Sequence, residues 1–481
     1  MSTARTAIKN SIMIFVSSIA IKLLALVFAI YVVRYLGAAN YGKYAFVFSL
    51  MTVFTILSSM GIDTLVVMDT ARDPASGRNL LLNAVLLKGV FVSVSWLILA
   101  ALTPFLGKGG EITLGIALVG FCLLPDAVIS TFKSFFSGCE RMELNTFLEI
   151  LYRLVFVALG LSAVVLRLEL ADFFLIPAVA SLVMLSAAVL IYRNLFSGRF
   201  TGLSVKAWQG LAARGYPFML AGLFVYVYRG LDTVLISLFK GDADVGIFSS
   251  ARALTDSFLF LPAAISGALL PAFSRIMGKS QESLKSAYGM SLKLLLLAAL
   301  LLTAIVTLFA KDVVLLVYGP GFVPAIQILR ILTWSTSLAF LNIIMITMLS
   351  ALDRQKDIAG SVFKMAVLSI FLNLVLIPRY GIMAAAWTSV ITEGVGLLFY
   401  ERLVQKHLRP APWGGLALKG LAAVFLLGLV YLCLKQFGPL AALIGSLISY
   451  FSALVLLKVL DGKDLALLKD FLAAGKRPVR D

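Results

Sequence analysis

Apolar segments long enough to cross a bilayer follow one another along almost the whole chain. A membrane-spanning helix needs roughly 20 predominantly apolar residues, and fourteen stretches of this sequence satisfy that requirement. Because lipid offers no partners to backbone N–H and C=O groups, segments of this length are expected to be helical. The sequence therefore predicts an all-α, polytopic membrane protein with about fourteen transmembrane helices, at residues 9–34, 41–66, 80–103, 112–137, 145–167, 171–194, 216–239, 245–272, 288–310, 323–351, 360–377, 382–405, 416–435 and 438–460.

The composition excludes a soluble globular protein. Of the 481 residues, 61% are hydrophobic and 14% are charged, whereas soluble domains are about half apolar and roughly a quarter charged. The first residues carry Arg5 and Lys9 and lead into a long apolar run without a small-residue cleavage site. This start is typical of a retained first span rather than of a cleaved signal peptide. The three cysteines have neither metal-ligand spacing nor the pattern of a disulfide framework.

The basic residues indicate the orientation in the membrane. The net charge is +17, but the Lys and Arg residues are spread over short connecting segments, which is typical of a membrane protein and argues against a nucleic-acid partner. With the N-terminus in the cytoplasm, the inward-facing segments hold most of these residues. We therefore expect a multi-pass protein of the cell membrane with both termini cytoplasmic. The longest inner segment, 193–215, has Trp208 and Leu211 at helical spacing, and part of it is expected along the lipid surface.

Two copies of one short pattern divide the chain. GAANYGKY at 37–44 matches GDADVGIF at 241–248, glycine on glycine and aromatic on aromatic, at an offset of 204 residues. Six predicted spans separate the copies, and this even number gives both the same orientation in the membrane. The sequence thus predicts two pseudo-symmetric six-helix lobes, 1–200 (spans 1–6) and 201–410 (spans 7–12). Two extra spans and a basic cytoplasmic tail follow in 411–481.

Charged side chains inside the predicted spans are the candidate functional residues, because a charge in hydrocarbon is costly unless it faces a partner or water. Lys22 lies at the centre of span 1 and Arg229 near the centre of span 7, so both lobes bring a cation to a similar depth. We expect a water-filled cavity whose cations hold a phosphate or pyrophosphate, for which the planar fork of arginine is well suited. The predicted cavity cations are Lys22, Lys88, Arg153, Arg229 and Arg252, and the acids that balance their charge, or take up a coupling proton or sodium ion, are Asp126, Glu149, Asp232, Asp256 and Glu393.

Local neutralisation is the alternative for charged residues with a partner nearby in the sequence. Three pairs are spaced i,i+3 or i,i+4 and could meet on one helix face, where they would only lower the cost of insertion: Arg229–Asp232, Arg252–Asp256 and Glu149–Arg153. Lys22, Lys88, Asp126 and Glu393 have no such neighbour, which favours a functional role. The sequence has no HExxH, GxSxG or P-loop pattern, and we expect neither a metal centre nor a cofactor.

Four stretches resemble one family of membrane proteins: RYLGAANYGKYAFVFSL (34–50), RGLDTVLISLFKGDADVGIFSSA (229–251), YGPGFVPAIQILRIL (318–332) and NLVLIPRYGIMAAAWTSVITE (373–393). In this order they are similar to the oligosaccharide flippases of the multidrug/oligosaccharidyl-lipid/polysaccharide superfamily, which are related to lipid II flippases. The resemblance implies two six-helix lobes around a central cleft that opens alternately to each side of the membrane. It implies as substrate a polyprenyl-pyrophosphate-linked oligosaccharide, flipped from the cytoplasmic to the outer leaflet for surface polysaccharide or glycoconjugate assembly.

The same resemblance implies further roles and partners. In the lipid II relatives two added C-terminal spans help line a groove for the lipid tail, and spans 13 and 14 are expected to do so here. Besides the lipid bilayer and the lipid-linked glycan, a glycan polymerase or glycosyltransferases of the same pathway are the partners to expect. Span 1 departs from those relatives, since it carries Lys22 alone and no cluster of arginines.

Two other functions stay open from the residues alone. A cation-coupled multidrug exporter of the same superfamily would favour an acidic cavity, whereas Lys and Arg are prominent inside these spans. A membrane-embedded glycan polymerase or glycosyltransferase would generally present a large outer loop with catalytic acids, and every predicted outer loop is short. We therefore predict a transporter rather than an enzyme.

Overall fold

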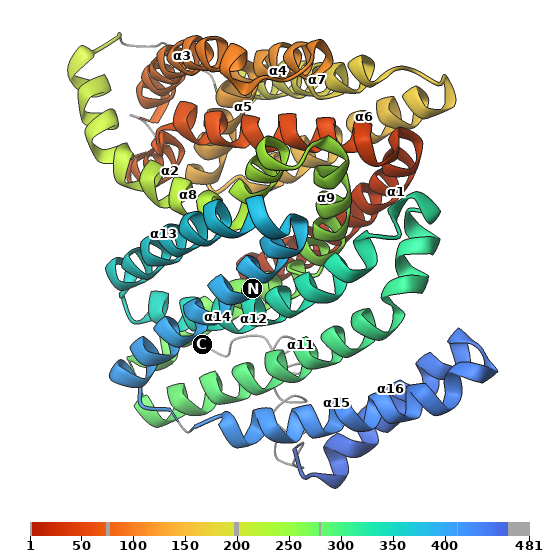
Figure 1. Ribbon diagram of the computed structural model, residues 1–481. Helices are drawn as coiled ribbons and strands as arrows, with labels where there is room; N and C mark the ends of the chain where they lie inside the picture. The colour runs from red at the N-terminus through yellow and green to blue at the C-terminus, as the bar shows by residue number, and fades with distance from the viewer. Residues whose placement is uncertain (1, 74–76, 197–201, 279, 411, 460–481) are drawn as a thin grey trace. The chain divides into compact units, whose positions relative to one another are not determined.

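The computed structural model describes residues 2–73, 77–196, 202–278, 280–410 and 412–459, and for residues 2–29 it describes the backbone alone. Within these ranges every regular element is helical, which confirms the predicted all-α fold. Figure 1 shows the helices, which are α1 (Ser2–Ser59), α2 (Ile62–Arg72), α3 (Gly77–Leu102), α4 (Gly110–Phe121), α5 (Leu123–Gly138), α6 (Met142–Val165), α7 (Leu170–Leu195), α8 (Val205–Phe239), α9 (Asp242–Ser257), α10 (Phe260–Met277), α11 (Gln281–Val317), α12 (Ala325–Ala351), α13 (Gln355–Tyr380), α14 (Ile382–His407), α15 (Gly414–Leu434) and α16 (Pro439–Leu456), together with the short 3-10 helices Thr103–Leu106, Pro320–Phe322 and Lys435–Phe437.

The number of membrane-spanning helices agrees with the prediction. Among the residues with described side chains, thirteen helical segments are long and apolar enough to cross a bilayer, beginning with Ile30–Ser59. The remaining predicted span, 9–34, lies in the first arm of α1. Gly37 interrupts α1 with φ 68° and ψ 175°, a backbone conformation that glycine adopts without steric cost. The single long element α1 therefore contains the first predicted span and most of the second, 41–66, whose last residues belong to α2.

Several predicted spans are two helices in succession. Met60 and Gly61 both have positive φ and separate α1 from α2. A second break at Cys122 separates α4 from α5, and Pro125 then lies in the first turn of α5, where its missing N–H costs little. The predicted span 245–272 is likewise divided into α9 and α10. The turn at Met60 and Gly61 places Asp63 at the start of α2, as described below.

The described chain forms two compact units. The N-terminal unit comprises residues 9–249 together with 373–382, and the C-terminal unit comprises the described residues within 1–8, 250–372 and 383–481. A compact unit need not coincide with a duplicated segment of the chain. The predicted division into lobes at residues 200 and 410 therefore stays a prediction. What the units do establish is that α8 packs with the helices that precede it in the sequence.

One core cluster of the N-terminal unit is formed mainly by α2, α3, α5, α6 and α7. Phe136 and Leu148 are fully buried in it. The rings of Phe135 and Phe196 meet edge to face at 5.1 Å, and such pairs contribute about 0.5–1.5 kcal/mol each. Leu211 of α8 belongs to this core and is 3% exposed. Leu211 therefore faces the protein, and the expected position of part of 193–215 along the lipid surface stays a prediction.

The two copies of the sequence repeat touch each other within the N-terminal unit. A Cβ atom on Gly42 would overlap the carbonyl oxygen of Asp242, and a Cβ atom on Gly246 would overlap the carbonyl oxygen of Ala38. The repeat offset maps Gly42 onto Gly246 and Ala38 onto Asp242, so the contact is reciprocal. Two helix turns related by a local two-fold axis produce this pattern, and glycine permits the close approach of their backbones.

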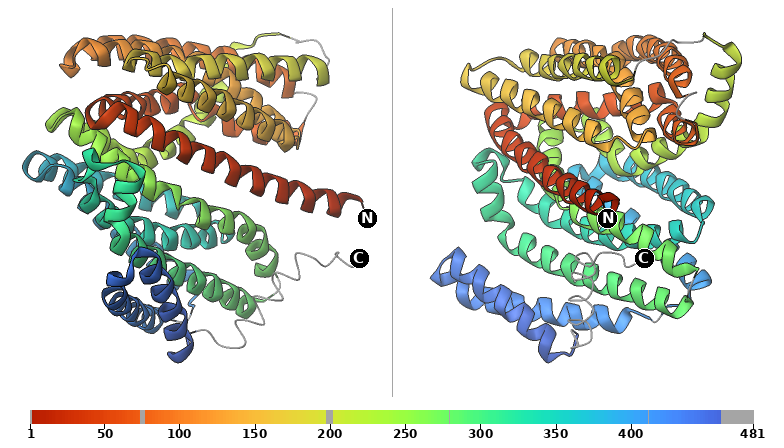
Figure 2. Two further views of the ribbon diagram at one scale, coloured as in Figure 1. Left: turned by 90° about the vertical axis from the view of Figure 1, so that its right-hand side faces the viewer. Right: turned by 180° about the vertical axis from the view of Figure 1, so that it is seen from behind.

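In the C-terminal unit, α15 and α16 form a hairpin that packs against α11 (Figures 1 and 2). The hydroxyl of Tyr450 in α16 donates to the carbonyl oxygen of Leu297 in α11, at 2.8 Å. Ala423 and Leu427 of α15 are fully buried in the same cluster. The last two spans are thus held to their unit by both packing and hydrogen bonding.

Candidate functional site

The N-terminal unit contains a cavity of about 760 Å³. Its wall is formed by the end of α1 and by parts of α2, α3, α5, α6, α7 and α8. The lining combines apolar surface with charged groups, and it includes three acidic and three basic side chains: Asp63, Asp126, Glu149, Lys88, Lys133 and Arg153. Ligand pockets commonly measure about 300–1,000 Å³, so the size suits a head group rather than an ion alone.

The break between α1 and α2 places the first of these charges. Because Met60 and Gly61 turn the chain, Asp63 falls in the first turn of α2, where the helix dipole favours a carboxylate. The same turn lies against α8: a Cβ atom on Gly61 would overlap the carbonyl oxygen of Gly215, and one on Gly215 would overlap the carbonyl oxygen of Met60. The helix α8 therefore approaches one end of the cavity at backbone contact.

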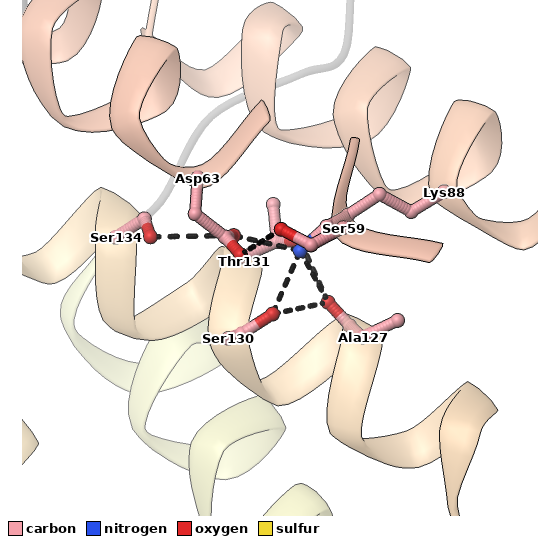
Figure 3. A network of polar contacts seen from close by, with 7 residues as sticks. All are labelled: Ser59, Asp63, Lys88, Ala127, Ser130, Thr131 and Ser134. Atoms are coloured by element: carbon pink, nitrogen blue, oxygen red, sulfur yellow. Dashed lines mark hydrogen bonds and ion pairs between the residues drawn. The ribbon is translucent and has the colours of Figure 1, made fainter. Parts of the chain in front are cut away.

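Lys88 of α3 is the most buried charge of the site, with 0% exposure. Figure 3 shows its ammonium group, which donates to Asp63 Oδ1 at 2.7 Å and to Ser130 Oγ at 2.7 Å. The hydroxyl of Thr131 and the carbonyl oxygen of Ala127 also lie within reach, both at 3.2 Å. A buried charge is tolerated only when it is paired and hydrogen-bonded, and Lys88 meets both conditions.

The remaining charges of the cavity are compensated unequally. Lys133 Nζ lies 2.6 Å from Glu149 Oε1, so Glu149 pairs across two helices. Asp126 accepts a hydrogen bond from Ser181 Oγ at 2.6 Å. No hydrogen bond or ion pair of Arg153 occurs within the described ranges. Its guanidinium is therefore the cation of this cavity that the protein leaves available to an anion.

Four of the predicted site residues come together at this cavity, namely Lys88, Asp126, Glu149 and Arg153. Two residues that complete it, Asp63 and Lys133, were not among the predicted ones. Both lie near the ends of their predicted spans, where a charge can reach water and carries less weight as a signal. The spacing Ser59–Asp63, one helical turn, was the pattern that could have drawn attention to Asp63, because Ser59 Oγ donates to Asp63 Oδ2 at 2.9 Å.

The other predicted residues are not among those that line this cavity, or they lie in the part of the chain whose side chains are not described. Lys22 belongs to the stretch whose side chains are outside the described residues. Arg229 of α8 lies with its guanidinium carbon 6.0 Å from the centre of the Tyr228 ring. Asp232, one turn further along α8, is 3% exposed and accepts from the backbone N–H of Thr233 at 2.8 Å. Neither Arg229 nor Asp232 is among the described residues that line the 760 Å³ cavity.

The C-terminal unit holds the last three. Arg252 donates from Nη2 to Ser389 Oγ of α14 at 3.0 Å. Asp256 is exposed at the end of α9. Glu393 is 5% exposed, and the side-chain amide of Asn342 donates to its Oε2 at 2.7 Å and to its backbone carbonyl oxygen at 3.0 Å. Their assignment to cargo binding or coupling stays a prediction.

Comparison with known sequences identifies the family. Residues 7–277 match the family described as polysaccharide biosynthesis protein. The chain belongs to this polysaccharide biosynthesis protein family. Residues 217–375 also match the MatE family. The family predicted from the sequence is thereby confirmed.

Individual relatives of this polysaccharide biosynthesis protein have low sequence identity to it, but the similarity extends over most of both chains. The probable flippase AglR of Haloferax volcanii is 23% identical over 398 residues, which covers 80% of this chain and 81% of that protein. The putative O-antigen transporter of Escherichia coli K12 is 23% identical over 374 residues, covering 76% of this chain and 88% of that protein.

Solved structures show the same fold. The lipid II flippase MurJ in an inward closed conformation superposes with a TM-score of 0.74 at 11% identity, covering 92% of this chain and 98% of MurJ. An inward-facing multidrug transporter of the MATE family superposes with a TM-score of 0.67 at 17% identity, covering 81% of this chain and 95% of that one. The protein is thus a multi-pass membrane protein of the polysaccharide biosynthesis protein family, with curated relatives named as a probable flippase and as a putative O-antigen transporter.

Proposed function

We propose that this protein flips a polyprenyl-pyrophosphate-linked oligosaccharide from the cytoplasmic to the outer leaflet by alternating access, for the assembly of a surface polysaccharide or glycoconjugate. Its relatives named as a probable flippase and as a putative O-antigen transporter support this proposal. The observation that carries the head-group chemistry is the Arg153 guanidinium, which lines the cavity and has no hydrogen-bond or ion-pair partner among the described residues.

The barrier to flipping is the transfer of a charged, hydroxylated head group through hydrocarbon, because buried polar groups without partners are strongly unfavourable. Arg153 can supply two parallel hydrogen bonds to a phosphate. The hydroxyl of Tyr152 lines the same cavity and offers a partner for a sugar hydroxyl. The polyprenyl tail, being apolar, has no need of the cavity and would stay in the lipid.

The predicted residues outside this cavity keep their proposed roles. Lys22 and Arg229 would bind the pyrophosphate at the middle of the membrane, with Arg252 as a further cation. The acids Asp232, Asp256 and Glu393 outside the cavity, together with Asp126 and Glu149 at the cavity, would balance these charges or take up a proton or sodium ion. We further propose that both termini are cytoplasmic, in keeping with the Lys and Arg distribution, and that pathway glycosyltransferases or a polymerase are partners.

The head-group role of Arg153 is tested by Arg153→Ala in proteoliposomes that contain a fluorescent polyprenyl-pyrophosphate-linked sugar. A charge-assisted hydrogen bond contributes about 1.5–3 kcal/mol, so translocation should fall by roughly ten- to 150-fold. Arg153→Lys should retain part of the rate, since the charge remains but the fork is lost.

Arg141→Ala is the matched control, because Arg141 begins the same helix and pairs with Glu143 at the surface. Its rate should equal that of the unsubstituted protein. Normal translocation by Arg153→Ala would reject the head-group role of Arg153. Failure of the unsubstituted protein to move any pyrophosphate-linked lipid would reject the flippase function itself.

A multidrug exporter is the second candidate, favoured by the MatE match and by the MATE-like fold. The acids Asp63, Asp126 and Glu149 at the cavity would then attract a cationic drug. Increased drug susceptibility of a deletion strain with unchanged surface glycan would favour this function over the flippase.

A further inference from the structure

The oxygens around the Lys88 ammonium group outnumber its hydrogens. Asp63 Oδ1 and Ser130 Oγ lie at 2.7 Å, and Thr131 Oγ1 and the Ala127 carbonyl oxygen lie at 3.2 Å. A lysine ammonium has three N–H donors and can make three directed hydrogen bonds. The four oxygens therefore exceed the three N–H donors by one. Their arrangement resembles the coordination shell of a cation rather than a set of hydrogen bonds to individual N–H groups.

Each of these oxygens presents lone pairs to the nitrogen, because the hydroxyl hydrogens are used elsewhere. Ser130 Oγ donates to the Ala127 carbonyl oxygen at 3.0 Å, and Thr131 Oγ1 donates to the same oxygen at 2.8 Å. Asp63 is in turn held by hydroxyl donors, Ser59 at 2.9 Å and Ser134 at 3.4 Å (Figure 3). The set is composed of acceptors and carries a single negative charge, that of Asp63.

We propose that these oxygens form a site for a monovalent cation, which the chain fills with its own ammonium group. The distances of 2.7–3.2 Å suit an ammonium or potassium ion, whereas Mg²⁺ requires a near-octahedral shell at about 2.0–2.1 Å. Because the ammonium of Lys88 is covalently attached, the charge of this site cannot leave with the cargo or exchange with either side of the membrane. The inference concerns the site alone and does not depend on what the protein transports.

The site adjoins the large cavity, since Lys88, Asp63 and Ser130 all line it. Truncation of Lys88 would leave the oxygens in place and open them to the cavity. The site should then bind a free cation of matching size, and the variant should acquire an ion requirement that the unsubstituted protein lacks.

The test compares three proteins: the unsubstituted protein, the Lys88→Ala variant and the Asp63→Asn/Lys88→Ala double variant. The Tm of each purified protein is measured in detergent at constant ionic strength, with choline, sodium, potassium, ammonium or methylammonium chloride. The unsubstituted protein should have the same Tm in every salt. In choline the Tm of Lys88→Ala should be lower by on the order of 10 °C, because Asp63 is left as an uncompensated charge.

Potassium, ammonium or methylammonium should restore most of that loss in a saturable manner, while the double variant should fold without any preference among the salts. The proposal is overturned if the unsubstituted protein responds to these cations as Lys88→Ala does. It is also overturned if Lys88→Ala gains nothing from any cation while the double variant folds. Failure of both variants to fold in every salt would likewise overturn it, since Lys88 would then act through its packing rather than its charge.

Discussion

The reciprocal glycine contact predicts that two alanine substitutions, 204 residues apart in the sequence, destabilise the N-terminal unit in the same way. In Gly42→Ala the new Cβ atom would lie 2.6 Å from the carbonyl carbon of Asp242, and in Gly246→Ala it would lie 2.8 Å from that of Ala38. The atoms in the way belong to the backbone of regular helices and cannot rotate aside. Because the carbonyl oxygens lie closer still, the helices must part by more than about 1 Å, an overpacking that typically costs about 1–3 kcal/mol.

Alanine recovers part of this cost, since it is the better helix former by up to about 1 kcal/mol. We expect a net loss of roughly 1–2 kcal/mol for each variant. For a unit of this size each kcal/mol lowers the Tm by about 2–4 °C, so thermal unfolding of the purified protein in detergent should begin about 2–8 °C earlier.

Gly210→Ala is the matched control. Gly210 lies inside α8, and a Cβ atom there would meet nothing within 4 Å. Helix propensity alone then applies, and the Tm should stay equal or rise. If Gly42→Ala and Gly246→Ala were as stable as Gly210→Ala, the two helices would not touch at these glycines, and the two-fold interpretation of the repeat would fail.

Two further predictions concern charged residues. Lys22→Ala and Arg229→Ala should each abolish glycan export while the protein still inserts into the membrane, and full export by the double variant, followed by surface-glycan staining, would contradict the proposed cation pair. Arg214→Ala should cost at most about 1 kcal/mol of stability, because its bidentate pair with Asp69, at 2.8 and 2.9 Å, is half-exposed. That loss should shrink in high salt, and an effect that is larger or independent of salt would show that Arg214 holds α8 by packing instead.

Hydropathy was sufficient to predict the helices but not the breaks within them. The predicted span 112–137 coincides with α4 and α5 together, yet nothing in its apolar character indicated the break at Cys122. Gly61 likewise lies inside a predicted span, so hydropathy did not indicate the turn that brings Asp63 to the cavity. The turn at Gly61 depends on the backbone dihedrals of single residues, whereas Cys122 keeps helical dihedrals. A windowed average over many residues detects neither.

Residues of the site could be predicted from the sequence only where a charge lies deep inside a predicted span. Lys88, Asp126 and Arg153 were found because they lie well inside their spans. The pairing of Glu149 was not, because its i+4 neighbour Arg153 was the obvious partner in sequence and the structure gives it Lys133 of a neighbouring helix. Contacts between helices depend on which faces meet, and that information is absent from spacing along one helix.

The length of α8 has a mechanical consequence. Its 35 residues extend roughly 50 Å at 1.5 Å per residue, well beyond the hydrocarbon thickness of about 30 Å. The first turns are anchored to the N-terminal unit through Leu211 and Gly215. Immediately after this anchor, Pro217 removes the backbone hydrogen bond to Ala213. The opposite end is held as well, since residues 232–237 are buried and Lys108 Nζ donates to the carbonyl oxygen of Ser237 at 2.7 Å. Pro217 is therefore a soft point between two anchored ends of one helix, at which α8 can bend without either end being released.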